Sequence, residues 1–114
     1  MKYICLVYAN EEHLHSLPES PADSECYAYA RQALEEGILL AGQALEPVSS
    51  ATTIKVRGGE ISVTDGPFAE TKEQLAGFYL IDARDLNEAI AFAQKIPPAR
   101  VGSIEVRPVR ELDV

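Results

Sequence analysis

Two short segments of the chain are apolar at every position along their length, and they constrain the fold more than any other feature. Residues 3–8 read Tyr-Ile-Cys-Leu-Val-Tyr, and residues 76–81 read Ala-Gly-Phe-Tyr-Leu-Ile. Both runs are rich in strand formers and too short for a stable helix, which predicts two buried strands. Because successive side chains of a strand point to opposite faces, each strand needs an apolar layer on both sides of its sheet.

The whole chain predicts the order strand, helix, strand, hairpin, strand, helix, strand. Residues 20–23, Ser-Pro-Ala-Asp, offer a cap, a proline at the first helical position and an acid at the third, so a helix is predicted from there to Gly37. Asp85 and Glu88 have capping-box spacing and predict a second helix that ends at Pro97. Strands are predicted at residues 3–8, 38–45, 52–57, 60–64, 75–81 and 103–109.

Each predicted helix has one apolar face that is expected to pack on the sheet. In the first helix this face consists of Ala22, Cys26, Ala30, Ala33 and Leu34. In the second helix it consists of Leu86, Ala89, Ile90, Ala93 and Ile96. The pair Gly58-Gly59 predicts a two-residue hairpin turn, across which Arg57 and Glu60 face each other, and one face of this hairpin is expected to be wet.

Two strand–helix–strand units predict an α+β fold, a ferredoxin-like sandwich with an extra β-hairpin. Two helices cover only one face of the sheet, so the other face needs a second apolar layer. A homodimer with the two sheets face to face supplies that layer. Either alternating set of strand residues can form this interface, because a one-residue change of register exchanges the faces.

Length, charge and hydropathy limit the classes of function. The 114 residues, of which 46% are hydrophobic and 25% charged, predict one domain over residues 1–114 with its own core. A formal charge of −8 with dispersed basic residues argues against nucleic-acid binding. No apolar run approaches the roughly 20 residues of a membrane span, and no signal-cleavage pattern follows the first strand, so a cytoplasmic protein without membrane contact is expected.

The sequence Thr-Asp-Gly-Pro-Phe-Ala-Glu-Thr-Lys-Glu at residues 64–73 is the first candidate for a functional loop. Asp65 is the candidate catalytic residue, because a carboxylate at a strand end beside an aromatic ring can act as base, acid or ligand anchor. The alternative is that Asp65 caps its own turn. Phe68 either lines a pocket or fills the core. Glu70 and Lys72 either orient a polar ligand or form a solvated ion pair.

Four tyrosines and one histidine are further candidates for ligand contact. Tyr8, Tyr27, Tyr29 and Tyr79 combine an apolar ring with a hydroxyl, so each either lines a pocket or packs in the core or dimer interface. His13 and His15 have a His-x-His spacing next to two acids, but no third ligand is identified, so no metal site is predicted. His13 remains a candidate for ligand binding. Phosphate loops, serine elbows and paired cysteines are missing from the sequence, and no cofactor is predicted.

The four residues Asp-Gly-Pro-Phe at 65–68 resemble the signature that names the DGPF branch of the YCII-related family. The resemblance extends to residues 2–8, 37–42, 77–81 and 105–109 and so spans nearly the whole chain. It implies a fold of the dimeric α+β barrel group. Several YCII-like domains have a histidine in the first helix that is thought to work with an aspartate, whereas this chain has Glu25 near that position.

Two functional hypotheses follow. The first is a small-molecule binding protein or cofactor-independent acid–base enzyme of lyase or isomerase type, with a pocket between sheet and helices bordered by the loop from Asp65 to Lys72. The second is a noncatalytic accessory or regulatory dimer, since the resemblance includes proteins described as transcription-related and associated with alternative sigma factors. The fold alone does not decide between them.

Overall fold

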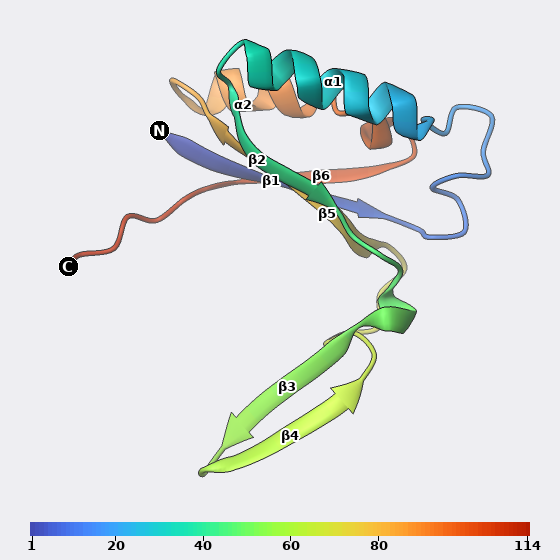
Figure 1. Cartoon of the computed structure of the whole chain (residues 1–114), viewed down its shortest axis with the longest axis vertical. Helices are drawn as coiled ribbons and strands as arrows, with labels where there is room; N and C mark the ends of the chain where they lie inside the picture. The colour runs from blue at the N-terminus through green and yellow to red at the C-terminus, as the bar shows by residue number, and fades with distance from the viewer.

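A four-stranded antiparallel sheet with two helices on one face forms the body of the molecule (Figure 1). The computed structural model describes residues 1–114. In sheet order the strands are β2 (Leu39–Ala44), β5 (Gln74–Asp82), β1 (Lys2–Ala9) and β6 (Gly102–Pro108). The helices are α1 (Asp23–Glu35) and α2 (Leu86–Ala93), with short 3-10 turns at η1 (Val48–Ser50) and η2 (Pro97–Arg100). The ferredoxin-like α+β fold is therefore confirmed.

The core lies between the sheet and the helices. Alternate residues of β1 point to this side, and β5 contributes the fully buried Ile81. The buried side chains of β1 are Tyr3, Cys5, Val7 and Ala9. Those that α2 and the segment after it add are Ala89, Phe92, Ala93 and Ile96. Burial of this apolar set against the sheet holds the two layers together.

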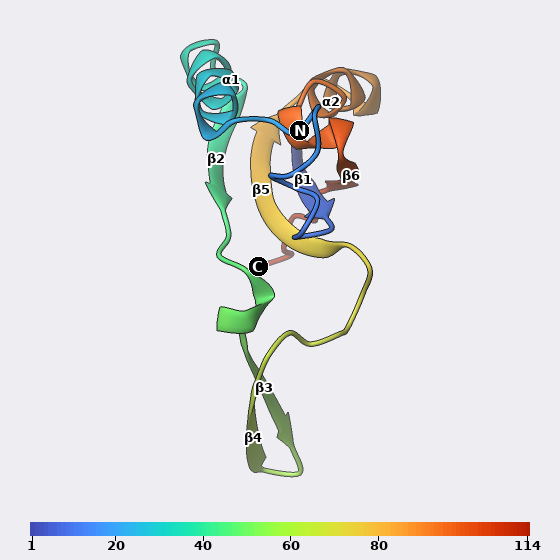
Figure 2. The same ribbon diagram turned by 90° about the vertical axis from the view of Figure 1, so that its right-hand side faces the viewer.

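The opposite face of the sheet is covered by no helix, and we call it the open face. Ile4, Leu6 and Tyr8 of β1 point to it because they alternate with the buried set. On β5 the register places Leu80 beside Ile4 and Phe78 beside Leu6. Figure 2 shows both helices on the same side of the sheet, with this face turned away from them. The structure thus shows which alternating set of β1 and β5 residues faces the helices and which lies on the open face, a choice that the sequence leaves undecided.

The two predicted helices begin and end differently from expectation at three points. The first helix begins at Asp23, and Ala22 at its N-cap makes no side-chain bond. Ser20, the expected cap, instead donates to the His13 carbonyl and accepts from the Leu17 amide, each at 2.9 Å, because the preceding loop needs this hydroxyl. Asp85 caps α2 as predicted, accepting from the Glu88 amide at 2.9 Å. That helix ends at Ala93, before the prolines.

The predicted buried faces of the helices are also partly wrong. Leu34 of α1 is 51% exposed, and Leu86 and Ile90 of α2 are 49% and 45% exposed. In their place Tyr29 packs on the core from α1 and Phe92 is buried from α2. The physical reason is the size of Phe92. Packing this ring against the sheet buries more apolar area than packing an aliphatic side chain of α2 would.

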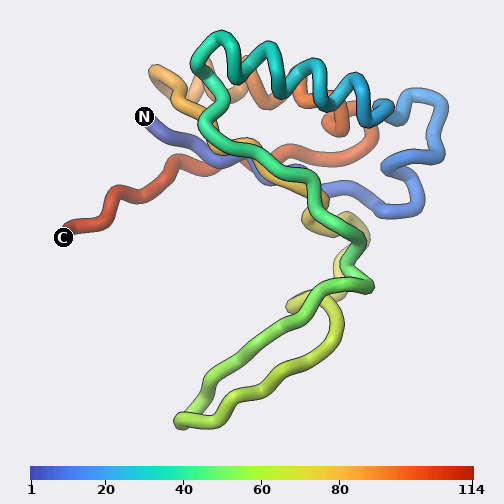
Figure 3. The backbone as a smooth tube through the Cα atoms, viewed as in Figure 1, coloured from blue at the N-terminus to red at the C-terminus, as the bar shows by residue number.

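The remaining strands form a separate hairpin that extends from the body. Strands β3 (Thr52–Arg57) and β4 (Glu60–Asp65) pair only with each other. Gly58 and Gly59 both have positive φ, as the predicted two-residue turn requires. The backbone trace in Figure 3 leaves the sheet after β2, runs out along the hairpin and returns to β5. Neither α1 nor α2 has the length and apolar character that a membrane-spanning helix requires.

Candidate functional site

A cleft of about 490 Å³ lies between α1 and α2 on the helix side of the sheet. The two helices stand apart over the sheet (Figure 2), and side chains from both line the space. Its apolar lining residues are Tyr29, Ala33, Ile38, Ile81, Ala83, Ala91 and Phe92. Its polar lining residues are Gln32, Glu36, Glu88 and Lys95. An apolar space with a small number of polar groups at its rim is the usual form of a small-molecule site.

Three aromatic rings form one wall of this cleft and the core beneath it. The ring centroid of Phe92 lies 5.1 Å from that of Tyr29 and 5.9 Å from that of Tyr79. The Tyr29 hydroxyl donates to the Phe92 carbonyl at 2.7 Å and so joins α1 to α2. Burial raises the pKa of both Tyr29 and Tyr79 to about 12. Both phenols are therefore neutral near pH 7 and keep a proton that can be donated in a hydrogen bond.

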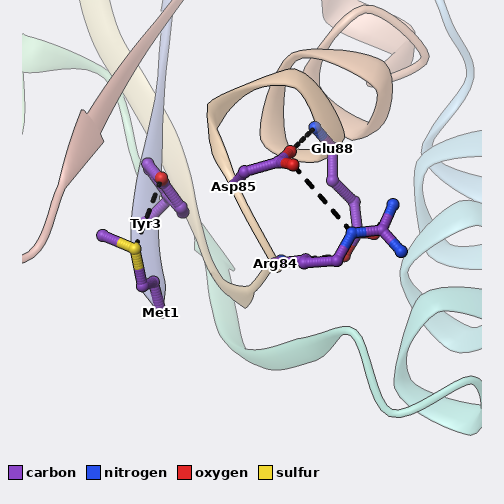
Figure 4. A network of polar contacts seen from close by, with 5 residues as sticks. All are labelled: Met1, Tyr3, Arg84, Asp85 and Glu88. Atoms are coloured by element: carbon purple, nitrogen blue, oxygen red, sulfur yellow. Dashed lines mark hydrogen bonds and ion pairs between the residues drawn. The ribbon is translucent and has the colours of Figure 1, made fainter.

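The rim of the cleft carries charges of both signs. Glu88 accepts from the Arg84 amide at 3.0 Å and pairs with the Arg84 guanidinium at 3.2 Å, as Figure 4 shows at the start of α2. The same view shows Asp85, 3.9 Å from Arg84, and the Tyr3 hydroxyl near the Met1 sulfur. Lys95, in contrast, takes part in none of the ion pairs of the structure. Its ammonium group is available to a ligand in the cleft.

Glu25 is used structurally in this chain. Its carboxylate forms two hydrogen bonds with the Arg100 guanidinium, at 2.6 and 2.8 Å. The hydrogen bond from Arg100 lowers the pKa of Glu25. The neighbouring Cys26 has its pKa raised, first by burial and then by the charges of Asp23 and Glu25. This thiol is therefore protonated near pH 7 and is not an activated nucleophile.

Asp65, the predicted catalytic residue, is the last residue of β4 and is exposed. The turn that follows is held by other groups. The Gly66 amide donates to the Ala51 carbonyl at 2.8 Å, and the Thr53 hydroxyl donates to the Gly66 carbonyl at 2.8 Å. Gly66 adopts a φ of +106°, which a side chain would disfavour. The Asp65 carboxylate is thus free of the turn, and the alternative that it caps this turn is not what the structure shows.

The other residues of the predicted loop lie with the hairpin, away from the helices (Figure 1). Phe68 is 79% exposed, with the Lys55 ammonium 5.5 Å from its ring centroid, so it does not fill the core. Glu70 and Lys72 are also exposed. None of these residues lines the cleft between the helices. The expectation that this loop borders a pocket between sheet and helices is therefore wrong for a single chain.

Three other candidates, Tyr8, Tyr79 and His13, lie apart from one another. Tyr8 lies on the open face, whereas Tyr79 lies on the helix face and packs on the core. His13 is exposed in the loop after β1, where its amide is bonded to Asn10. In that loop the Glu11 carboxylate accepts from the Val48 amide at 2.8 Å. The structure does not bring these candidates together.

Sequence reasoning named Tyr29 as a candidate pocket residue but missed Phe92 and Lys95. Phe92 is the one aromatic residue in α2. This could have indicated that the face of the helix that carries Phe92 packs on the sheet. Lys95 has no comparable signal, because its place at the rim depends on where α2 ends. The cleft joins residues from two helices and β5, and no local pattern predicts such a combination.

Comparisons with known proteins identify the family of the chain, a relative in sequence and similar solved structures. The family model of the YCII-related domain matches residues 1–113. An uncharacterized protein of Rhizobium meliloti (strain 1021) is 43% identical over 115 residues, which cover 96% of this chain and 92% of that protein.

Among solved structures, 5-chloro-2-hydroxyhydroquinone dehydrochlorinase from Burkholderia phenoliruptrix AC1100, in complex with 2,5-dihydroxybenzoquinone, has a TM-score of 0.51 at 14% identity. The match covers 96% of this chain and 94% of that one, and it shows likeness of fold. The divalent cation tolerance protein from Thermus thermophilus has a TM-score of 0.43 at 16% identity, over 99% of this chain and 88% of that one.

Proposed function

This chain belongs to the YCII-related domain family, and on that premise we propose that it binds a small ring compound in the cleft between α1 and α2. The observation that carries the proposal is the combination of an apolar, aromatic-walled space of about 490 Å³ with an unpaired ammonium at its rim. That volume falls within the range of roughly 300–1,000 Å³ that small-molecule sites occupy.

The ligand chemistry follows from the lining. A planar ring would pack on Phe92 and Tyr29, since offset or edge contacts between aromatic rings are favourable. An anionic substituent would reach Lys95, since neither rim carboxylate is paired with it: Glu88 pairs with Arg84, and Glu36 accepts from the Gln32 side-chain amide. The Tyr29 hydroxyl donates to a backbone carbonyl, so it is not the primary donor for a ligand. We therefore expect an aromatic carboxylate or phenolate to bind better than its uncharged counterpart.

The dehydrochlorinase gives this proposal limited support. Its structure is a complex with 2,5-dihydroxybenzoquinone, so a protein of the same fold holds a small oxygenated ring. At 14% identity the likeness extends to the fold alone, and the choice of ligand for this chain rests on its own cleft. Acid–base chemistry by Asp65 is a further proposal, which requires that a ligand come within reach of that carboxylate.

A thermal-shift experiment tests binding in the cleft. Benzoate, benzyl alcohol and 2,5-dihydroxybenzoquinone serve as probes, since a ligand that binds the native state raises its stability. Ala91→Phe fills the cleft from α2, while Ala28→Phe adds the same ring to an exposed position of α1 outside the cleft. We expect benzoate to stabilise the wild type and Ala28→Phe but not Ala91→Phe. Equal shifts in all three proteins would place binding elsewhere, and no shift with any probe would favour the accessory or regulatory hypothesis.

We also propose that the chain is a homodimer, in which the open faces of two sheets pack together. The apolar residues available for this contact are Ile4, Leu6, Phe78 and Leu80. Leaving these four neighbouring side chains in water would be unfavourable, and a twofold pairing buries the same face on both copies. Leu6→Asn should convert the dimer to a monomer, which light scattering would detect.

A further inference from the structure

The hairpin of β3 and β4 carries its apolar side chains on one face only. Ile54 lies directly opposite Val63, and Val56 lies opposite Ile61. Because side chains alternate along a strand, all four share a face. The residues of the other face are Thr53, Lys55, Arg57, Glu60, Ser62 and Thr64. The four apolar side chains are between 56% and 72% exposed, so the hairpin has one polar face and one apolar face that is open to solvent.

Nothing in the same chain covers this apolar face. The two strands hydrogen-bond only with each other, and Figures 1 and 2 show them projecting from the body on the side away from the helices. An isolated two-stranded hairpin is marginally stable at best in water. The hairpin therefore needs an external apolar surface to remain ordered.

The accessible surface and the radius of gyration of the chain are both larger than those of a compact monomer. Its accessible surface is 8106 Å², whereas a compact monomer of 12.4 kDa has about 6,100 Å². Its radius of gyration is 15.8 Å, against about 13 Å for a compact chain of this length. The excess of about 2,000 Å² on each chain corresponds to an extensive interface of the kind that obligate homodimers have.

The position of the hairpin indicates which molecule supplies the surface. The hairpin projects on the open-face side of the sheet (Figure 1). This is the side on which the proposed homodimer has its second copy. A strand of six residues spans about 20 Å, whereas facing sheets lie about 10 Å apart. With two sheets face to face, a hairpin of this length would reach past the plane of the partner's sheet and lie beside the partner's body. A twofold axis places both hairpins in this way.

The charge of the hairpin also suits a second copy. Lys55 and Arg57 are balanced by Glu60 and Asp65, so the segment has no net charge in a chain of formal charge −8. A neutral segment approaches a second acidic chain without adding to the repulsion between them.

We infer that this hairpin, residues 52–65, is an exchanged arm whose apolar face packs on the second copy of the chain. The inference rests on the proposed homodimer and goes beyond it. The open faces form the centre of the dimer, and each arm extends the interface over the partner. An arm so placed also carries the attached Asp65 and Phe68 toward the partner subunit.

The test compares two variants of the arm by sedimentation on dilution and by amide hydrogen exchange. Ile54→Ser with Ile61→Ser removes apolar area from the contact face, while Lys55→Ser with Thr64→Ser changes the opposite face and serves as control. We expect the first variant to dissociate at concentrations at least about tenfold higher than the wild type, because each lost contact removes buried apolar area. The control should behave as the wild type.

Hydrogen exchange separates this inference from the dimer itself. Arm amides should be protected in the wild-type dimer and should exchange rapidly in the first variant, while the amides of β1 and β5 stay protected and report that the body is folded. Two results would overturn the arm and leave the dimer standing. One is a first variant that dissociates at the same concentration as the wild type, and the other is rapid amide exchange of the arm in the wild-type dimer. A wild type that is monomeric at micromolar concentration would overturn both.

Discussion

Glu25 and Arg100 are joined by two parallel hydrogen bonds of 2.6 and 2.8 Å, although 75 residues separate them in the chain. Arg100 also donates to the Glu19 carbonyl at 3.1 Å. One guanidinium group therefore connects η2 with the start of α1 and with the loop that precedes it. Since α1 forms one side of the cleft, this contact helps to fix the separation of the two helices.

Replacing this carboxylate should change how stability depends on acid. The pKa of Glu25 is lowered from its ordinary value of 4.5, so the stabilising contact is present above that value and is lost as pH falls through the lowered pKa. Glu25→Gln should therefore be less stable than the wild type at pH 7, and the difference should shrink toward pH 3. Urea unfolding at both pH values measures it, with Glu35→Gln as control. A difference that does not vary with pH would contradict the prediction.

Alkaline pH should destabilise the core through its tyrosines. The pKa of Tyr79 is raised from 10.0 to about 12 by burial, so the folded state holds its proton over a range where the unfolded state loses it. This contribution is fully present below pH 10 and is lost as pH rises toward 12. Tyr79→Phe should accordingly lose less stability between pH 9 and about 11.5 than the wild type. Tyr27→Phe, at an exposed site, is the control, and an equal loss in both would refute the assignment.

The turn at the base of the arm should be sensitive at Gly66 and tolerant at Asp65. Gly66→Ala forces a side chain into a φ of +106° and should cost roughly 1–2 kcal/mol, although no atom lies within 4 Å of the added carbon. Asp65→Asn should change the free energy of unfolding by about 0.5 kcal/mol or less, since it alters an exposed side chain. Chemical denaturation measures both. If Asp65→Asn abolishes binding or activity at unchanged stability, a charged role is supported, and unchanged binding excludes one.

Removal of both histidines should have little effect. His13 and His15 are exposed, and no group of three potential ligands converges on them. The double variant His13→Ala, His15→Ala should keep the stability of the wild type to within about 0.5 kcal/mol. Elemental analysis of untagged protein measures metal content directly. Stoichiometric zinc, nickel or manganese that disappears in the double variant would show a site that this loop completes with other groups.

Features that depend on neighbouring residues could be predicted from the sequence, whereas features that depend on packing could not. Gly58-Gly59 and the pair Asp85 and Glu88 determine a turn and a helix start by local hydrogen bonds and allowed φ values, and the structure confirms both. Ser20 has an equally good local signal, yet its hydroxyl bonds to Leu17 and His13 within the preceding loop, whose conformation no simple pattern predicts. Leu34 is exposed because the rotation of a helix on a sheet is decided by the whole interface.

The candidate site shows the same division. Tyr8 and Tyr79 are both strand residues with identical side chains, but alternation along two strands and their register place them on opposite faces of the sheet. A sequence can mark either tyrosine as a pocket residue, and only the register decides that they cannot share a pocket. Tyr29 on α1 and Lys95 in the turn after α2 line the same cleft, and their proximity follows from tertiary structure alone.

The central position of β1 bears on how the protein is made in the cell. This strand precedes its hydrogen-bonding neighbours β5 and β6 in the chain, so Tyr3 cannot be paired on both sides until Ile81 and Pro108 have been synthesised. A nascent chain on the ribosome therefore carries an apolar strand with two unpaired edges for most of its synthesis, and long-range pairing of this kind is slow. Chains interrupted before residue 102 would keep one edge of β1 open. Such fragments are the species that we expect chaperones and proteases to intercept.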